Sequence, residues 1–240
     1  MSGMCGRYAT TRSAADLSAL FEAYDDTAGG LTPDYNVAPT DPVPIVRMST
    51  SRGERVLAGA RWGLVPTWAK DAKGAARMIN ARAETVATSS AYASPFAKRR
   101  CLVPADGWYE WLRRPDGRKQ AYFMTPAHGG VLAMAGLWSP WGEGLTFSVV
   151  TTAAIGDLAL VHDRMPLLLP WQRWAGWLAG GGDAEELLNA PSDEFLAGIE
   201  IRPVGPDVGD VRNDGPHLVE RVPGATLGGP PEEPVELTLF

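Results

Sequence analysis

The stretch CLVPADGWYEWLRRPDGRKQAYFMTPAHGGVLAMAGLWSPWGEGLTFSVVTT, residues 101–152, decides the expected fold. It contains short runs rich in apolar, aromatic and β-branched residues, namely CLVPA, GWYEWL, QAYFMT, VLAMAGLW and LTFSVVTT. The turn sequences RPDGRK and PAHGG separate some of these runs. Strands this close together leave no room for crossover helices, so the spacing predicts antiparallel pairing.

The flanking sequence adds further strands and a set of helices. Residues 43–47 and 55–64 are typical of strands joined by a polar turn. Helices are expected at residues 13–24, where Ser13 and Asp16 have capping-box spacing, at 90–99, broken by Pro95, and at 153–161, 171–178 and 183–189. We therefore predict an α+β fold, a single domain with a mostly antiparallel, partly barrel-like β-sheet and peripheral helices.

Composition limits the classes of function. With 240 residues, 45% of them hydrophobic and 21% charged, the chain can bury a globular core. The net charge of −6 argues against strong nucleic-acid binding, but most Lys and Arg lie in residues 1–119, which leaves a local basic face possible. Two cysteines and no apolar leader favour a reducing, cytoplasmic setting, and Pro and Gly interrupt the longest uncharged stretch, so no membrane partner is expected.

Several common chemistries lack their signatures. The sequence has no G-x-x-x-x-G-K, G-x-G-x-x-G or G-x-S-x-G motif. Its histidines are His128, His162 and His217, and no zinc-ligand spacing occurs among them and the cysteines. We therefore expect no metal and no cofactor, and we look for side-chain nucleophiles and acid–base groups.

Reactive and aromatic residues concentrate in a few short motifs. These are MCGRYA (4–9), YNVAPT (35–40), RWGLVPTWA (61–69), INARAET (79–85), CLVPADGWYEW (101–111) and VHDRMP (161–166). In this order they resemble the SRAP family, the SOS response-associated peptidases, whose members process abasic sites in single-stranded DNA. The resemblance runs from Met4 to about Val222. It implies a domain over residues 5–222 and a leader 1–4 absent from the mature protein, while a composition rich in Pro, Gly and Glu predicts a disordered tail 223–240.

Cys5 is the expected nucleophile. A free α-amine has a pKa of about 8, so the amine of an N-terminal cysteine is partly neutral at physiological pH and attacks aldehydes. The thiol then closes a five-membered thiazolidine, which an internal cysteine cannot form. The ring-opened abasic sugar is an aldehyde. Without the resemblance, a buried small residue is the alternative for Cys5, and Cys101 is interpreted as a buried strand residue with no catalytic role.

The resemblance assigns supporting roles to three further residues. Glu110, in an aromatic strand, is expected to move protons if it is desolvated, the alternative being that it faces water. His162 lies in a motif, and the resemblance assigns it a role in acid–base catalysis, since histidine exchanges protons near neutral pH. His128 and His217 are expected at the surface. Asn80 would position the amine and the sugar, unless it only forms a turn.

The expected DNA contacts surround these groups. Arg7, Arg82 and Arg164 each follow a catalytic candidate by two residues, and in extended chain i and i+2 share a face, so they suit phosphate contacts. Structural ion pairs are the alternative for any one of them. Trp68 and Trp111 are expected to stack on bases. The resemblance also carries a DNA-binding role to Asn36 and Pro39.

Three functions remain open. The first is a monomeric protein that binds single-stranded DNA and forms a covalent thiazolidine crosslink with abasic sites through Cys5, with possible weak lyase activity. The second is a thiol peptidase, including self-cleavage, in which Cys5, His162 and Asn80 form a Cys–His–Asn arrangement. The third is a non-covalent single-strand binding module, whose complexes with DNA would not survive denaturation.

Overall fold

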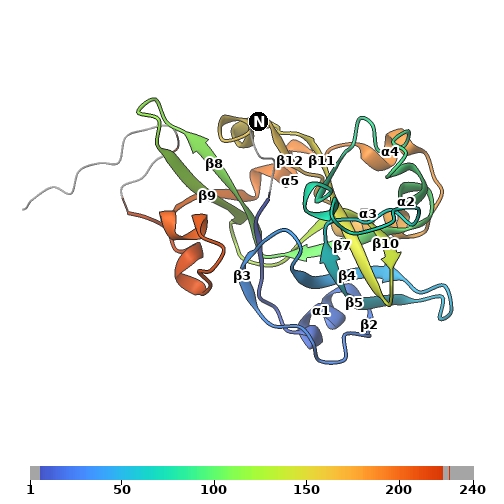
Figure 1. Cartoon of the computed structure of the whole chain (residues 1–240). Helices are drawn as coiled ribbons and strands as arrows, with labels where there is room; N and C mark the ends of the chain where they lie inside the picture. The colour runs from blue at the N-terminus through green and yellow to red at the C-terminus, as the bar shows by residue number, and fades with distance from the viewer. Residues whose placement is uncertain (1–5, 224–226, 228–240) are drawn as a thin grey trace, which may run out of the picture.

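The computed structural model describes residues 6–223 and 227, and it confirms the α+β class and the mostly antiparallel sheet (Figure 1). Its strands, in chain order, are β1 (Tyr8–Thr10), β2 (Tyr24–Asp25), β3 (Asp34–Val37), β4 (Pro42–Met48), β5 (Arg55–Trp62), β6 (Asn80–Arg82), β7 (Arg100–Ala105), β8 (Gly107–Arg113), β9 (Lys119–Pro126), β10 (Leu132–Trp141), β11 (Gly144–Ala153), β12 (Arg164–Pro166) and β13 (Ile199–Val204). The five strands expected within residues 101–152 are β7 to β11.

One sheet closes into a small barrel. Strands β11, β10, β7, β4 and β5 are neighbours in that order, and β11 also pairs with β5 in parallel, Phe147 lying opposite Trp62. Strand β6 adds to β11 in parallel, and β12 adds to it antiparallel. The barrel-like prediction is therefore confirmed, and β11 is the strand on which three of the six sequence motifs meet.

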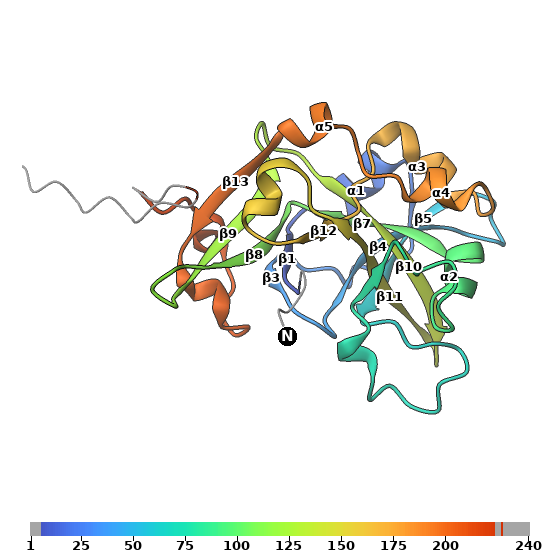
Figure 2. The same cartoon turned by 90° about the horizontal axis from the view of Figure 1, so that it is seen from above.

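A second sheet has the order β13-β9-β8-β1-β3. Its β8–β9 hairpin needs a glycine at its base, because a Cβ atom at Gly107 would lie 2.3 Å from the carbonyl oxygen of Met124. Figures 1 and 2 show this hairpin on the side of the molecule opposite the helices α2 (Ala93–Lys98), α3 (Trp171–Leu178) and α4 (Ala184–Leu188).

The main core lies between the two sheets. It joins side chains of both, including Tyr8 and Trp108 from the second sheet and Trp62 and Phe147 from the barrel. The rings of Tyr8 and Trp62 meet edge to face at 5.0 Å between centroids. Burial of these large rings holds the sheets together and brings residues far apart in the sequence to one place.

The first helix is shorter than predicted. Helix α1 (Ala14–Phe21) begins after Ser13, whose hydroxyl accepts the Asp16 N–H as expected. It ends at Glu22, whose φ of 51° is left-handed. The prediction up to residue 24 is wrong because Tyr24 pairs with β5 as part of β2.

Two further helix predictions need correction. Pro95 does not break the helix expected at 90–99, because α2 begins at Ala93 and so places the proline in its first turn, where no N–H donor is required. The helix expected at 153–161 is a short 3-10 turn, Gly156–Leu160, because β11 continues to Ala153. Helices α3 and α4 confirm the expectations at 171–178 and 183–189, and α5 (Asp193–Ala197) was not predicted.

None of the helices within residues 6–223 is long and apolar enough to cross a bilayer. The expected leader, residues 1–4, and Cys5 lie outside the described residues. Of the expected tail, the structure describes Pro223 and Leu227, and Leu227 packs against the main core.

Candidate functional site

Glu110 is a buried carboxyl group. It lies in the middle of β8 with only 2% of its surface exposed. Because side chains alternate along a strand, it shares a face with Trp108, and its pairing partner on β9 is Tyr122, both members of the main core. The alternative that Glu110 faces water is therefore wrong. Among aromatic side chains the charged form of a carboxyl group loses the solvation it would have in water. The neutral form is therefore favoured, which suits a group that takes up and releases a proton.

Asn80 is buried as well, with 9% of its surface exposed. It begins β6 and lies opposite Val149 of β11, a residue of the main core. The Tyr92 hydroxyl donates to the Asn80 carbonyl oxygen at 3.1 Å and holds the strand end in place. The turn-forming alternative is wrong, because Asn80 is a strand residue whose side chain lies on the face of the sheet that carries Val149.

His162 lies in the short loop before β12, and its side chain is 8% exposed. Its Nδ1 accepts the backbone N–H of Arg164 at 3.0 Å. Oδ1 of Asp163 also lies 3.1 Å from Nδ1, a contact that needs a protonated Nδ1 and so competes with the first. The Asp163 side chain is 86% exposed, so water screens its carboxylate, and the Arg164 carbonyl oxygen lies farther from Nδ1, at 3.3 Å. On the closer amide contact we assign Nδ1 as the acceptor and place the proton of the neutral ring on Nε2.

These three side chains border one core. Trp108 flanks Glu110 and Val149 lies opposite Asn80, while Val161 precedes His162, and all three neighbours belong to the main core cluster. The five-stranded sheet carries Glu110, and the β6–β11–β12 corner of the barrel carries Asn80 and the loop of His162. Three residues spread over about 80 positions of the sequence thus have neighbours in the same core cluster.

The N-terminal strand passes beside this place. The backbone N–H of Tyr109, the residue before Glu110, donates to the carbonyl oxygen of Arg7 at 3.0 Å. Tyr8 and Trp108 are paired in the same ladder. Cys5 itself lies outside the described residues.

Arg7 and Asn36 are engaged within the protein. Arg7 Nη1 donates to Asn36 Oδ1 at 2.7 Å and to the Val208 carbonyl at 2.9 Å. Asn36 Nδ2 donates to the carbonyl oxygens of Asp210 and Asn213, each at 2.9 Å. Burial lowers the pKa of Arg7, and the nearby carboxylates partly offset this shift. Both side chains tie the 206–213 segment to β1 and β3.

Arg164 forms a bidentate ion pair with Glu84. The distances are 2.5 Å from Nη1 to Oε1 and 3.0 Å from Nη2 to Oε2. Nη2 also donates to the Thr151 carbonyl at 2.6 Å. Hydrogen bonding from Arg164 is the main cause that lowers the pKa of Glu84. Sequence reasoning missed Glu84 and Thr151, although Glu84 lies inside the INARAET motif and has the charge to pair with a motif arginine.

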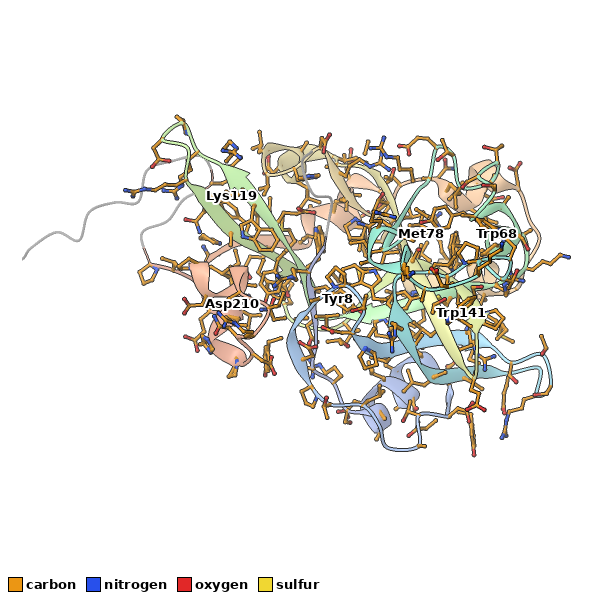
Figure 3. The ribbon with its side chains drawn as sticks, viewed as in Figure 1. Tyr8, Trp68, Met78, Lys119, Trp141 and Asp210 are labelled. Carbon is orange, nitrogen blue, oxygen red and sulfur yellow. The ribbon has the colours of Figure 1, made fainter. Side chains whose placement is uncertain are left out.

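Arg82 and Trp68 face solvent. Arg82 is exposed at the end of β6, on the same face as Asn80, as expected for i and i+2 in extended chain. Trp68 is 66% exposed and lines a hollow of about 260 Å³ together with Met78. Figure 3 shows Trp68 and Met78 on the side of the molecule away from Lys119 on the β8–β9 hairpin.

The remaining predicted contacts are half-buried. Trp111 packs against the third core cluster, on the face of β8 opposite Glu110, with Tyr109 and Phe123. Pro39 lies in the loop after β3. Cys101 is fully buried, and burial raises the pKa of its thiol. The reactive thiolate is therefore disfavoured, which is consistent with the prediction that Cys101 has no catalytic role. His128 and His217 are exposed, as expected.

Comparisons with known proteins identify the family of this chain. The sequence model described as "SOS response associated peptidase (SRAP)" matches residues 4–211. The abasic site processing protein YoqW of Bacillus subtilis is 32% identical, covering 90% of this chain and 99% of its own. The abasic site processing protein YedK of Escherichia coli is 32% identical, covering 91% and 100% respectively.

Two more similarities widen the range of organisms. The abasic site processing protein HMCES of Gallus gallus is 32% identical, over 95% of this chain and 80% of its own. A crystal structure of a protein from Bacteroides thetaiotaomicron superposes with a TM-score of 0.78 at 23% identity, covering 91% of this chain and all of the other, which shows a shared fold. The chain belongs to the SOS response associated peptidase (SRAP) family.

Proposed function

We propose that this protein captures abasic sites in single-stranded DNA by forming a covalent link through Cys5 as its N-terminal residue. The observation that carries the proposal is the buried carboxyl group of Glu110 beside the N-terminal strand, in a chain whose relatives bear the name of abasic site processing proteins. Burial disfavours the charged form of a carboxyl group, which makes Glu110 a candidate for proton transfer.

Chain geometry supports the pairing of Cys5 with this site. Two residues of extended chain span at most about 7 Å, so Cys5 is confined near Arg7. The carbonyl oxygen of Arg7 accepts the N–H of Tyr109, and Glu110 is the next residue. Position 5 is therefore at most two residues of chain away from a residue that pairs with the strand carrying Glu110.

The bond-forming steps balance without a cofactor. The Cys5 α-amine bonds to C1′ of the ring-opened sugar, and the aldehyde oxygen leaves as water, giving an imine. The thiol then adds across the C=N bond: sulfur bonds to C1′ and the thiol proton ends on nitrogen, closing the thiazolidine. In the imine the C2′ protons are acidified, which accounts for a weak β-elimination, or lyase, side reaction.

The buried groups have distinct tasks in these steps. Glu110 takes the proton that the amine loses and returns it to the departing oxygen. His162, which carries its proton on Nε2, donates to the sugar oxygen as the ring opens. The Asn80 amide orients the sugar, because it both donates and accepts.

DNA binding is assigned to the exposed groups. Arg82 contacts a phosphate next to the abasic nucleotide, and Trp68 stacks on a neighbouring base. Arg7 and Arg164 shape the site through their internal bonds. The net charge of −6 implies weak general affinity, so capture depends on the covalent step.

The aminothiol chemistry requires Cys5 to have a free amine. Met1, Ser2, Gly3 and Met4 precede it in the sequence, so they must be missing from the active protein. Translation from Met4 followed by removal of that methionine gives this N-terminus, as does self-cleavage before Cys5. Methionine aminopeptidases remove Met before a small residue, so we favour the first route.

The test is a denaturing gel. Protein that begins at Cys5 is incubated with a uracil-containing oligonucleotide treated with uracil glycosylase, and a shifted band that survives denaturation is expected. Cys5→Ala should abolish the band, while the matched control Cys101→Ala should retain it. A band of equal strength in Cys5→Ala overturns the covalent role of this residue.

A further inference from the structure

The ion pair between Glu84 and Arg164 joins two parts of the candidate site. Glu84 lies four residues after Asn80, in the turn that follows β6, and Arg164 is the first residue of β12. Both strands flank β11, and the Thr151 carbonyl of β11 accepts from Ala83 N–H at 2.9 Å and from Arg164 Nη2 at 2.6 Å. The pair therefore crosses β11 and fastens the Asn80 segment to the His162 segment.

The same arginine sets the state of the histidine ring. The Arg164 guanidinium, with a side chain only 11% exposed, is fixed by Glu84 and Thr151. Its backbone N–H donates to His162 Nδ1 at 3.0 Å, which leaves the proton of the neutral ring on Nε2. The position of Arg164 thus decides which nitrogen of His162 is the donor.

We infer that Glu84 is a positioning residue: its carboxylate grips Arg164, and Arg164 in turn holds the Nε2–H tautomer and the orientation of His162 opposite Asn80. Glu84 touches neither DNA nor the reacting atoms. The inference deepens the proposed function and rests on it only for the assignment of His162 to catalysis.

Nitrogen NMR of the His162 ring in DNA-free protein tests the inference directly. The wild type should show the Nε2–H tautomer, and Glu84→Gln should show a mixture of tautomers. The matched control is Glu200→Gln, because Glu200 also grips an arginine, Arg202, at 2.6 Å on β13. Glu200→Gln should leave the His162 signals unchanged. If Glu84→Gln does not fold, Arg164→Lys gives the same test, because lysine keeps the charge and lacks the bidentate grip.

Crosslinking rates supply the second readout. Relative to Glu200→Gln, Glu84→Gln should crosslink about tenfold more slowly, since small displacements of a catalytic group cost large factors in rate. Its affinity for undamaged single-stranded DNA should match that of the control. An unchanged tautomer and rate in Glu84→Gln overturns the inference, as does a faster rate, which would mean that Glu84 restrains Arg164 from DNA. If the wild type does not crosslink, the proposed function is overturned. The inference about Glu84 is then decided by the NMR comparison of the His162 tautomers alone.

Discussion

At the scale of single residues, the structure chooses between readings that the sequence left open for Glu110 and Asn80. Glu110 occurs in a strand that alternates, and alternation alone allows either face, so its burial depended on which sheet covers β8. His162 and Asn80 were placed in motifs, but their nearness to one core was not visible, because β6 and β12 pair with β11 and are about 80 positions apart in the sequence.

At this scale we predict that Glu110→Gln and His162→Ala slow crosslinking without abolishing it. Each assists proton movement and neither forms the bond to C1′, and acid–base assistance is typically worth about 10²–10⁴-fold. Gel-based rates at short times should show the loss, while the endpoint yields approach that of the wild type. Equal initial rates in wild type and both variants would remove these groups from the mechanism.

At the scale of helices and strands, the strands themselves were easier to predict than their pairing. The strands within residues 101–152 were predictable because each is a short apolar run bounded by turn residues. The barrel-like character was expected, but the pairing that closes the barrel was not, because the β5–β11 contact joins residues about 85 positions apart and leaves no local pattern. Helix boundaries also failed where tertiary pairing won, as at Tyr24 and Ala153.

Arg100 is expected to clamp two helices to the barrel. It is 4% exposed and donates to the carbonyl oxygens of Trp177, Phe96 and Gly181, and burial lowers its pKa. Arg100→Leu should cost roughly 3 kcal/mol or more of unfolding free energy, because it leaves buried carbonyls without donors. Urea denaturation measures this loss.

The control for that clamp is Arg173→Leu. Arg173 also donates to backbone carbonyls, those of Asn189 and Leu187, but it is less buried. Its loss should cost clearly less than that of Arg100. Equal losses of unfolding free energy in the two variants would show that the deeper burial of Arg100 does not increase its contribution to stability.

Glu200 makes the stability of β13 depend on pH. Hydrogen bonds from Arg202, followed by that from Arg221, lower its pKa. A carboxyl group with a depressed pKa in the folded state stabilises the fold above its unfolded pKa of about 4.3, and this stabilisation is lost as pH falls through the folded value. The drop in Tm on acidification from pH 7 to pH 3 should therefore be smaller in Glu200→Gln. An identical drop in both proteins would contradict the assignment.

For the whole molecule, the main core lies at the junction of the two sheets, and Arg82 and Trp68, which the proposed function assigns to DNA binding, are exposed. Duplex DNA should compete poorly with single strands, because reaching the sugar aldehyde requires unstacking of neighbouring bases at a cost of a few kcal/mol per step. Crosslink yields on internal abasic sites in duplex and single-stranded oligonucleotides measure this. Equal yields would mean that the protein opens the duplex without penalty.

The central claim is that Cys5 bonds to the abasic sugar through its own amine and thiol. Mass spectrometry of the crosslink after nuclease and trypsin digestion tests it most directly. We predict an adduct on the peptide Cys5–Gly6–Arg7, with a mass equal to the peptide plus the sugar remnant minus one water. An adduct on any other peptide, or a crosslinked chain that still carries Met1 to Met4, would contradict the account.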